Sequence, residues 1–352
     1  MAKRAPISET DDSDRVEGYP HPRETATFIG QDAPLARAAR AVRGGKPPQG
    51  WLISGPPGIG KATLAYRIAR YLLAYGARDT GAADLSVPTN DPSAIQVAAG
   101  SHPGLLVLKR GINERTGKPM TELPVGEVRR LAGFFGMTSG AGGWRVAIVD
   151  TADDMNDNAA NAILKLLEEP PSRAMLLLLT NRPGQLLATI RSRCQKLDLR
   201  PLDEELVADA LKTLLPDADA HERTALARLS GGSIGAALAI AGGEGRDLAG
   251  EADRLIENAS HPDVIALLAL GERLWRIRDG LSRFGDFLAE TLGRRIRARA
   301  HSGGQDLQAW TSLLARLEEN FARARALNLE PRQTVLSAAR DLAATARRVG
   351  TL

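Results

Sequence analysis

The sequence predicts an α/β domain with a parallel sheet, followed by a region built only from helices. The first observation is a set of short, continuous apolar runs, which are typical of strands buried on both faces. The second is that amphipathic segments separate these runs, as in a doubly wound domain. The third is the helical spacing of Leu and Ala after about residue 203. The four runs are WLIS (51–54), LLVL (105–108), VAIVD (146–150) and MLLLLT (175–180).

Composition and punctuation divide the chain into four parts. Residues 1–22 are polar and charged and contain Pro, so we expect a disordered tail. Residues 23–200 form the expected α/β domain, which ends at a Pro. We expect a small domain of short helices over 201–245 and a larger helical domain over 246–352.

The bulk composition is that of a soluble protein. The 352 residues are 43% hydrophobic and 25% charged. The net charge of +4 is too small to show whether the protein works close to nucleic acid or comes from a genome that favours Arg over Lys. Cys194 is the single cysteine, which excludes an internal disulfide and fits a reduced, cytoplasmic location. No apolar stretch approaches 18 residues and the N-terminus lacks an apolar signal region, so we expect no membrane partner.

The segment GPPGIGKAT (55–63) predicts a phosphate-binding loop. It follows the run WLIS and precedes an amphipathic segment, as a P-loop requires, whereas a Gly-rich turn without ligand is the plainer alternative. The residue after the lysine is usually Ser or Thr, whose hydroxyl binds Mg²⁺, but here it is Ala62, and Thr63 lies about 100° further around the helix. We therefore expect ATP or ADP to bind with a weakly held Mg²⁺. The residues expected to hold the phosphates are Gly55, Gly58, Gly60 and Lys61.

Three strings together carry a family resemblance: GPPGIGKAT, VAIVDTADDMNDNAANAILKLLEEPP and LLLLTNRPGQLLATIRSRCQKLDLRPL. They closely resemble the clamp-loader branch of the AAA+ proteins, for which NAxLKxLEEPP followed by SRC is very specific. The resemblance covers about residues 28–240. It implies a AAA+ P-loop domain with a five-stranded parallel sheet, a helical lid over 201–245 and a helical oligomerisation collar over 246–352.

The run VAIVD ends in Asp150, which resembles the Walker B aspartate that helps to hold Mg²⁺. Members of this family that cleave ATP follow that aspartate with a Glu that activates water. Here Thr151 follows, and a Thr hydroxyl cannot act as a base near neutral pH. We interpret Asp153 and Asp154 as solvated or helix N-terminal acids. The sequence thus retains the residues that bind nucleotide and lacks the catalytic base.

The string Ser192-Arg193-Cys194 resembles the motif that supplies an arginine finger to a neighbouring subunit. Such an arginine stabilises charge on the transferred phosphoryl group and contributes about 10³–10⁵ in rate. Arg191 is the alternative finger, and a surface salt bridge is the plainer interpretation of Arg193. Cys194 is then a small packing residue, because no partnered base is apparent in the sequence.

Two further strings resemble nucleotide sensors. Thr180-Asn181 lies at the sensor 1 position, where Asn181 would contact the γ-phosphate; the alternative is a simple strand-ending turn. The string GSIG (232–235) resembles the sensor 2 motif, but Gly235 stands where active relatives carry Arg. The residues at 62, 151 and 235 therefore all point to lost hydrolysis.

Many relatives carry a four-cysteine zinc module after the first helix of the α/β domain. The cysteine-free segment 78–104 takes that place and lacks a clear helical period, so we expect a long loop and no zinc. Arginines are also frequent in the last hundred residues, and we favour solubility over intersubunit ion pairs as their role. They are Arg294, Arg295, Arg297, Arg299, Arg323 and Arg325.

The resemblance implies a rigid, non-hydrolysing stator in a five-subunit loader of the bacterial replicative DNA polymerase. Its implied partners are the gamma/tau and delta subunits, with the sliding clamp and primer–template DNA reached through the assembly. An ATP-hydrolysing gamma/tau-like motor is the alternative, but it would need Glu after Asp150, Ser or Thr at 62 and Arg near 235. A small-molecule P-loop kinase would have no reason to carry the LEEPP and SRC strings.

Overall fold

The computed structural model describes most of the chain, and most of the expected tail over 1–22 lies outside the described residues. By its internal contacts the chain divides into two units, one formed by residues 1–206 with 233–235, the other by 207–232 with 236–352. The described residues are 16, 18–110, 112–113, 118–120, 122–123, 125–136, 143–277, 280–302, 307–327 and 329–351.

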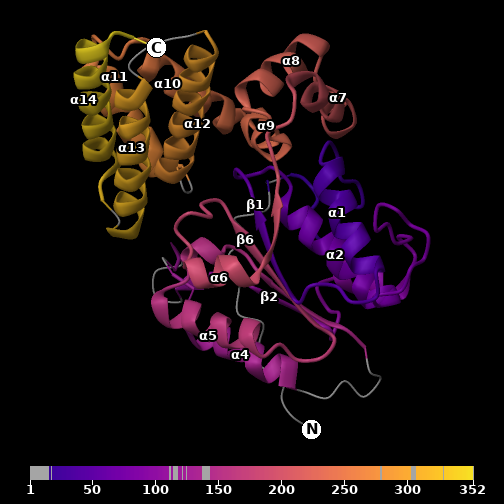
Figure 1. Ribbon diagram of the computed structural model, residues 1–352. Helices are drawn as coiled ribbons and strands as arrows, with labels where there is room; N and C mark the ends of the chain where they lie inside the picture. Colours follow the sequence, from indigo (N-terminus) through magenta and orange to yellow (C-terminus); the bar gives the residue numbers. More distant parts are fainter. Residues whose placement is uncertain are drawn as a thin grey trace. The chain divides into compact units, whose positions relative to one another are not determined.

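The first unit is built on a five-stranded sheet in the order β2-β5-β6-β1-β7, in which all neighbouring strands run parallel (Figure 1). The four apolar runs are confirmed as strands. The fifth strand, β7, alternates exposed and buried residues at the edge of the sheet, which explains why no apolar run marks it. The strands are β1 (Gly50–Ser54), β2 (Leu105–Leu108), β5 (Arg145–Val149), β6 (Ala174–Thr180) and β7 (Gln195–Asp198).

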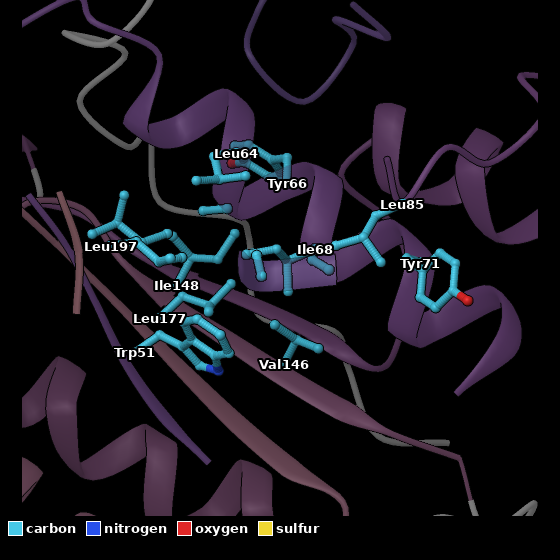
Figure 2. Close-up of a cluster of buried hydrophobic side chains, with 14 of the residues drawn as sticks. Trp51, Leu64, Tyr66, Ile68, Tyr71, Leu85, Val146, Ile148, Leu177 and Leu197 are labelled. Atoms are coloured by element: carbon cyan, nitrogen blue, oxygen red, sulfur yellow. The ribbon is translucent and has the colours of Figure 1, made fainter. Parts of the chain in front are cut away.

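Helices cover both faces of this sheet, because successive strand residues point to opposite sides. On one face, Trp51, Ile148 and Leu177 pack beneath helix α2 (Figure 2). On the other face, Leu52 and its neighbours pack against α4, α5 and α6. The helices are α1 (Asp32–Arg43) and α2 (Lys61–Tyr75) on the first face, and α4 (Val125–Gly136), α5 (Asp157–Glu168) and α6 (Ala188–Arg193) on the second.

The segment 78–104 is better ordered than a long loop, and that expectation is wrong for part of it. Residues Pro92–Ala98 form helix α3, whose N-terminus is capped by the carboxylate of Asp91. Leu85 is fully buried in the core beside α2 (Figure 2). The seven residues of α3 make about two turns, too few for a recognisable period.

Three short elements complete the first unit, namely β3 (Ile112–Asn113), β4 (Lys118–Pro119) and the 3-10 helix η1 (Ala152–Asp154). Strands β3 and β4 pair antiparallel, apart from the main sheet.

The second unit is helical, as the Leu and Ala spacing predicts. Its larger core contains Phe284, Leu288, Trp310 and Leu342, with α12 packed against α13 and α11 against α14. The helices that follow the sheet are α7 (Glu204–Leu214), α8 (Ala220–Leu229), α9 (Ile234–Ala241), α10 (Gly243–Glu257), α11 (Val264–Arg276), α12 (Gly280–His301), α13 (Leu307–Leu327) and α14 (Pro331–Val349).

Several arginines of this unit bind groups on the same chain. Arg294 and Arg295 pair with the Asp253 carboxylate at 3.6 and 2.9 Å, and Arg297 pairs with Glu290 at 3.0 Å. Packing within the helical unit is therefore part of their role. In the described part of the chain, no single helix is long and apolar enough to cross a membrane, although the bent pair α8 and α9 meets that test when taken together.

Candidate functional site

The parallel sheet gathers the predicted nucleotide-binding residues at one edge. The P-loop follows β1, Asp150 follows β5, and Thr180 ends β6 directly beside Ser54, the last residue of β1. Because the carboxyl ends of parallel strands share one edge, these residues lie together there, which we call the carboxyl edge.

The P-loop has the backbone geometry that phosphate binding needs. Gly55, Gly58 and Gly60 have φ angles of 152°, 71° and 102°, which residues with side chains rarely adopt. Helix α2 begins at Lys61, so its first N–H groups lie at the loop.

The Lys61 side chain is 7% exposed and lies within the loop. Its ammonium donates to the carbonyl oxygens of Gly55 at 2.9 Å and Pro56 at 2.7 Å, which uses two of its three N–H donors. Burial lowers the pKa of Lys61 to about 8, against the opposing effect of Asp150 and Asp153. The remaining donor and the positive charge suit a phosphate group.

The site has fewer of the residues that would bind Mg²⁺ than of those that would bind phosphate. Ala62, the second residue of α2, packs against the core and brings no oxygen atom to the position where a Ser or Thr hydroxyl would bind Mg²⁺. Among the described residues, no group of three or more His, Cys, Asp or Glu side chains is arranged to hold a metal ion. The residues therefore fit the phosphates of a nucleotide better than they fit its Mg²⁺.

The acids after Asp150 are bonded within the chain, so of the two interpretations of Asp153 and Asp154, solvated acids is wrong and acids at a helix N-terminus agrees with the structure. They lie in η1, and the Asp153 carboxylate accepts from the Thr180 hydroxyl at 2.5 Å and from the Asn181 backbone N–H at 2.6 Å. Asp154 accepts from the Thr151 hydroxyl at 2.7 Å. Thr151, at the position of the missing glutamate, is thus a hydrogen-bond donor to a neighbouring acid.

The Asp153 hydrogen bonds also hold the two residues of the predicted sensor 1, Thr180 and Asn181. They fix the backbone at Asn181 beside the end of β6, and they use the hydroxyl of Thr180, which is fully buried. This contact is not predictable from the sequence, because nothing in the string TADD distinguishes a bonded acid from a solvated one.

The segment Ser233–Gly235 packs directly onto the P-loop. The Gly235 backbone N–H donates to the Gly58 carbonyl at 3.0 Å, and the Ser233 hydroxyl donates to the Pro57 carbonyl at 3.0 Å. A Cβ atom on Gly235 would lie 2.8 Å from the Gly58 Cα, closer than such atoms approach one another. The glycine at the sensor 2 position is therefore required by a backbone contact, and the only sign of this contact in the sequence is the missing Arg.

Arg193 lies at the opposite edge of the same sheet. Cys194 and Gln195 follow it, and Gln195 pairs with Trp51 near the start of β1. A Cβ atom on Gly50, the first residue of β1, would lie 3.6 Å from the Arg193 carbonyl oxygen. The P-loop follows the other end of this five-residue strand, roughly 13–17 Å away. We call this second region the amino edge.

The structure distinguishes the two candidate finger arginines. Arg193 is exposed; its guanidinium pairs with Glu168 at 3.0 Å and donates to the Thr189 carbonyl at 3.2 Å. Arg191 is half-buried and donates to the Pro183 carbonyl of its own loop at 3.2 Å. Arg193 is therefore the more exposed of the two.

The residues around Arg193 are closely packed. Cys194 is buried, and burial raises the pKa of its thiol to about 12, so the sulfur is protonated and is no nucleophile near neutral pH. A Cβ atom on Gly50 would lie 2.5 Å from a Leu167 methyl group and 3.4 Å from the Cys194 sulfur. The predicted packing role of Cys194 agrees with this environment.

Comparison with known proteins identifies the family. A family model described as "DNA polymerase III, delta subunit" matches residues 30–203. The chain is 40% identical over 185 residues to DNA polymerase III subunit delta′ of Pseudomonas aeruginosa, covering 52% of each chain. It is 35% identical over 199 residues to the delta′ subunit of Escherichia coli, covering 55% of this chain and 54% of that one. The matched part spans about half the length of these relatives.

A solved structure also aligns, that of a DNA polymerase III gamma subunit-related protein from Thermotoga maritima. It covers 90% of this chain and 99% of its own, with 18% identity and a TM-score of 0.39. The fold assignment rests on the strand order and P-loop described above.

The matched residues 30–203 include the sheet, the P-loop and Arg193, and this part of the chain belongs to the clamp-loader family of AAA+ proteins. Its relatives include the delta-prime subunits of DNA polymerase III and, at 29% identity over 234 residues, the tau subunit of Escherichia coli, with 64% of this chain and 34% of that one covered.

Proposed function

We propose that this chain acts as a clamp-loader subunit of the DNA polymerase III holoenzyme, supplies Arg193 to the nucleotide site of a neighbouring gamma/tau subunit, and hydrolyses no ATP efficiently itself. The observation that carries the proposal is the separation of the two edges. Arg193 lies a strand's length from the chain's own P-loop and is exposed, so it suits a phosphate held by another subunit.

The chemistry follows from the guanidinium. It is planar, always charged and carries five N–H donors, of which the contacts to Glu168 and Thr189 use two. The others can reach oxygens of a γ-phosphate across an interface, where they stabilise the charge that develops in the transition state. Because these contacts are made within the chain, the charge is in position before the neighbour arrives.

The chain's own site lacks the groups that would drive hydrolysis. Thr151 donates its hydroxyl to Asp154 and has no carboxylate, Ala62 offers no metal ligand, and Gly235 bonds the P-loop backbone where an arginine would be needed. The motor alternative needs all three functions. We propose that ATP or ADP binds to Lys61 and the P-loop backbone, with poorly held Mg²⁺ and no efficient turnover.

In this proposal the helical residues 246–352 form an oligomerisation collar and 201–245 form a lid. The partners are the gamma/tau and delta subunits, and the complex, in the cytoplasm, loads a sliding clamp onto primed DNA. The names of the relatives support this assignment. Co-purification of this chain with a delta and a gamma/tau subunit tests it, and failure to enter such a complex would remove it.

The finger assignment is tested by Arg193→Ala in a loader reconstituted from gamma/tau, delta and this chain. We expect turnover at the site beside this chain to fall about 10³-fold, so that ATP hydrolysis stimulated by clamp and primed DNA falls by at least that site's share. Arg191→Ala is the matched control, because it removes the neighbouring and less exposed arginine of α6; we expect a rate close to wild type. An unchanged rate with Arg193→Ala would remove the assignment.

A further inference from the structure

The Arg193 guanidinium is held by two acceptors of its own chain. Its Nη2 lies 3.0 Å from a carboxylate oxygen of Glu168, and its Nη1 donates to the Thr189 carbonyl at 3.2 Å. Thr189 lies in α6 with Arg193, whereas Glu168 comes from another helix. The carboxylate therefore restricts the arginine in a way that its own helix cannot.

The position of Glu168 is itself fixed by packing. It is the last residue of α5, and the preceding Leu167 packs against the start of β1, where Gly50 leaves room for its methyl group. Cys194, which follows Arg193 in the chain, is buried against the same residue, Gly50. The carboxylate and the backbone of the arginine are thus both tied to the amino edge of one sheet.

We infer that Glu168 is a positioning residue for Arg193: it holds the guanidinium in the orientation in which the neighbour's phosphate meets it. This inference rests on the proposed finger role. An arginine that is ordered beforehand loses less side-chain freedom when it binds phosphate, and it stabilises a developing charge without reorganising. Glu168 does not touch the nucleotide in this account.

The rate change expected on removing Glu168 is small, because the ion pair is exposed to solvent. The Arg193 and Glu168 side chains are 39% and 52% exposed, so their ion pair is screened by water and salt. Loss of an exposed ion pair of this kind corresponds to about a two- to fivefold change in the rate of ATP turnover at the site that Arg193 serves. This is far smaller than the loss expected when the arginine itself is removed.

The test uses the reconstituted loader with clamp and primed DNA, and measures kcat and KM for ATP. For Glu168→Ala we expect turnover at the site beside this chain to fall about two- to fivefold at unchanged KM, so that the loader's kcat falls by less than it does for Arg193→Ala. Glu168→Gln, which keeps an acceptor without charge, should recover part of the loss. Glu169→Ala is the matched control: it removes the adjacent acid, which makes no ion pair in the described part of the chain, and we expect the wild-type rate.

A double-mutant cycle separates positioning from a general structural effect. In the Arg193→Ala background, Glu168→Ala should cause no further loss. The positioning role is overturned if Glu168→Ala alone leaves kcat unchanged or raises it. It is also overturned if Glu168→Ala lowers kcat by the same factor in the wild-type and the Arg193→Ala backgrounds. In either case the finger role stands. If Arg193→Ala itself has no effect, the proposed function fails first.

Discussion

The two edges of the sheet differ in where their polar groups are bonded. At the carboxyl edge, Lys61 is buried and donates to carbonyl oxygens of its own loop, and Asp153 binds the end of β6. At the amino edge, Arg193 is exposed, and its contacts to Glu168 and Thr189 use two of its five N–H donors. Because β1 separates the two regions, one can lose catalysis while the other retains its charge. The proposed function requires this separation: a nucleotide site that lacks the groups for hydrolysis and, away from it, an arginine that can bind a neighbour's phosphate.

The largest expected effect tests whether the carboxyl edge still binds nucleotide. Replacing Lys61 with Ala removes a buried charge from the loop, so we expect affinity for ATP or ADP to fall at least about tenfold, as for a charge-assisted hydrogen bond. Lys196→Ala, which removes an exposed lysine of β7, is the control. Equilibrium titration with a fluorescent nucleotide measures the change. Equal affinities for both variants would show that the loop holds no phosphate.

The next effect sharpens the interpretation of the sensor 2 position. Gly235→Ala places a Cβ atom 2.8 Å from Gly58, so we expect the free energy of unfolding to fall by about 1–3 kcal/mol. Gly133→Ala is the matched control, because a Cβ there meets nothing within 4 Å on the exposed side of α4; the gain in helix propensity should stabilise by about 0.5–1 kcal/mol. Denaturant unfolding of both variants provides the comparison, and equal effects would contradict the contact.

The smallest effect concerns pH. The pKa of Lys61 is lowered to about 8 from its usual value near 10.5, so the ammonium loses its charge as pH rises through about 8. Nucleotide phosphates favour the charged form, and affinity should therefore be highest below pH 8 and about fivefold weaker at pH 9 than at pH 7. Titrations between these values test it. Affinity that does not change with pH, or that rises, would contradict the burial of a charged lysine in the loop.

The sequence predicts the frame of the molecule because each inner strand is a continuous apolar run buried on both faces. Strand β7 and helix α3 are not found that way, since the first alternates at a sheet edge and the second has only seven residues. At the site, glycine spacing and Lys61 are readable from the chain. The contacts of Asp153, Gly235 and Glu168 are not, because their partners lie 27, 177 and 25 residues away, at Thr180, Gly58 and Arg193.

The central claim, that this chain cannot complete catalysis at its own P-loop, is tested most directly by ATP turnover of the purified chain with Mg²⁺. We predict no sustained turnover above that of the Lys61→Ala variant, because Thr151, Ala62 and Gly235 replace the base, a metal ligand and a sensor arginine. Multiple turnovers by the wild-type chain, abolished in Lys61→Ala, would contradict the account and favour a motor subunit.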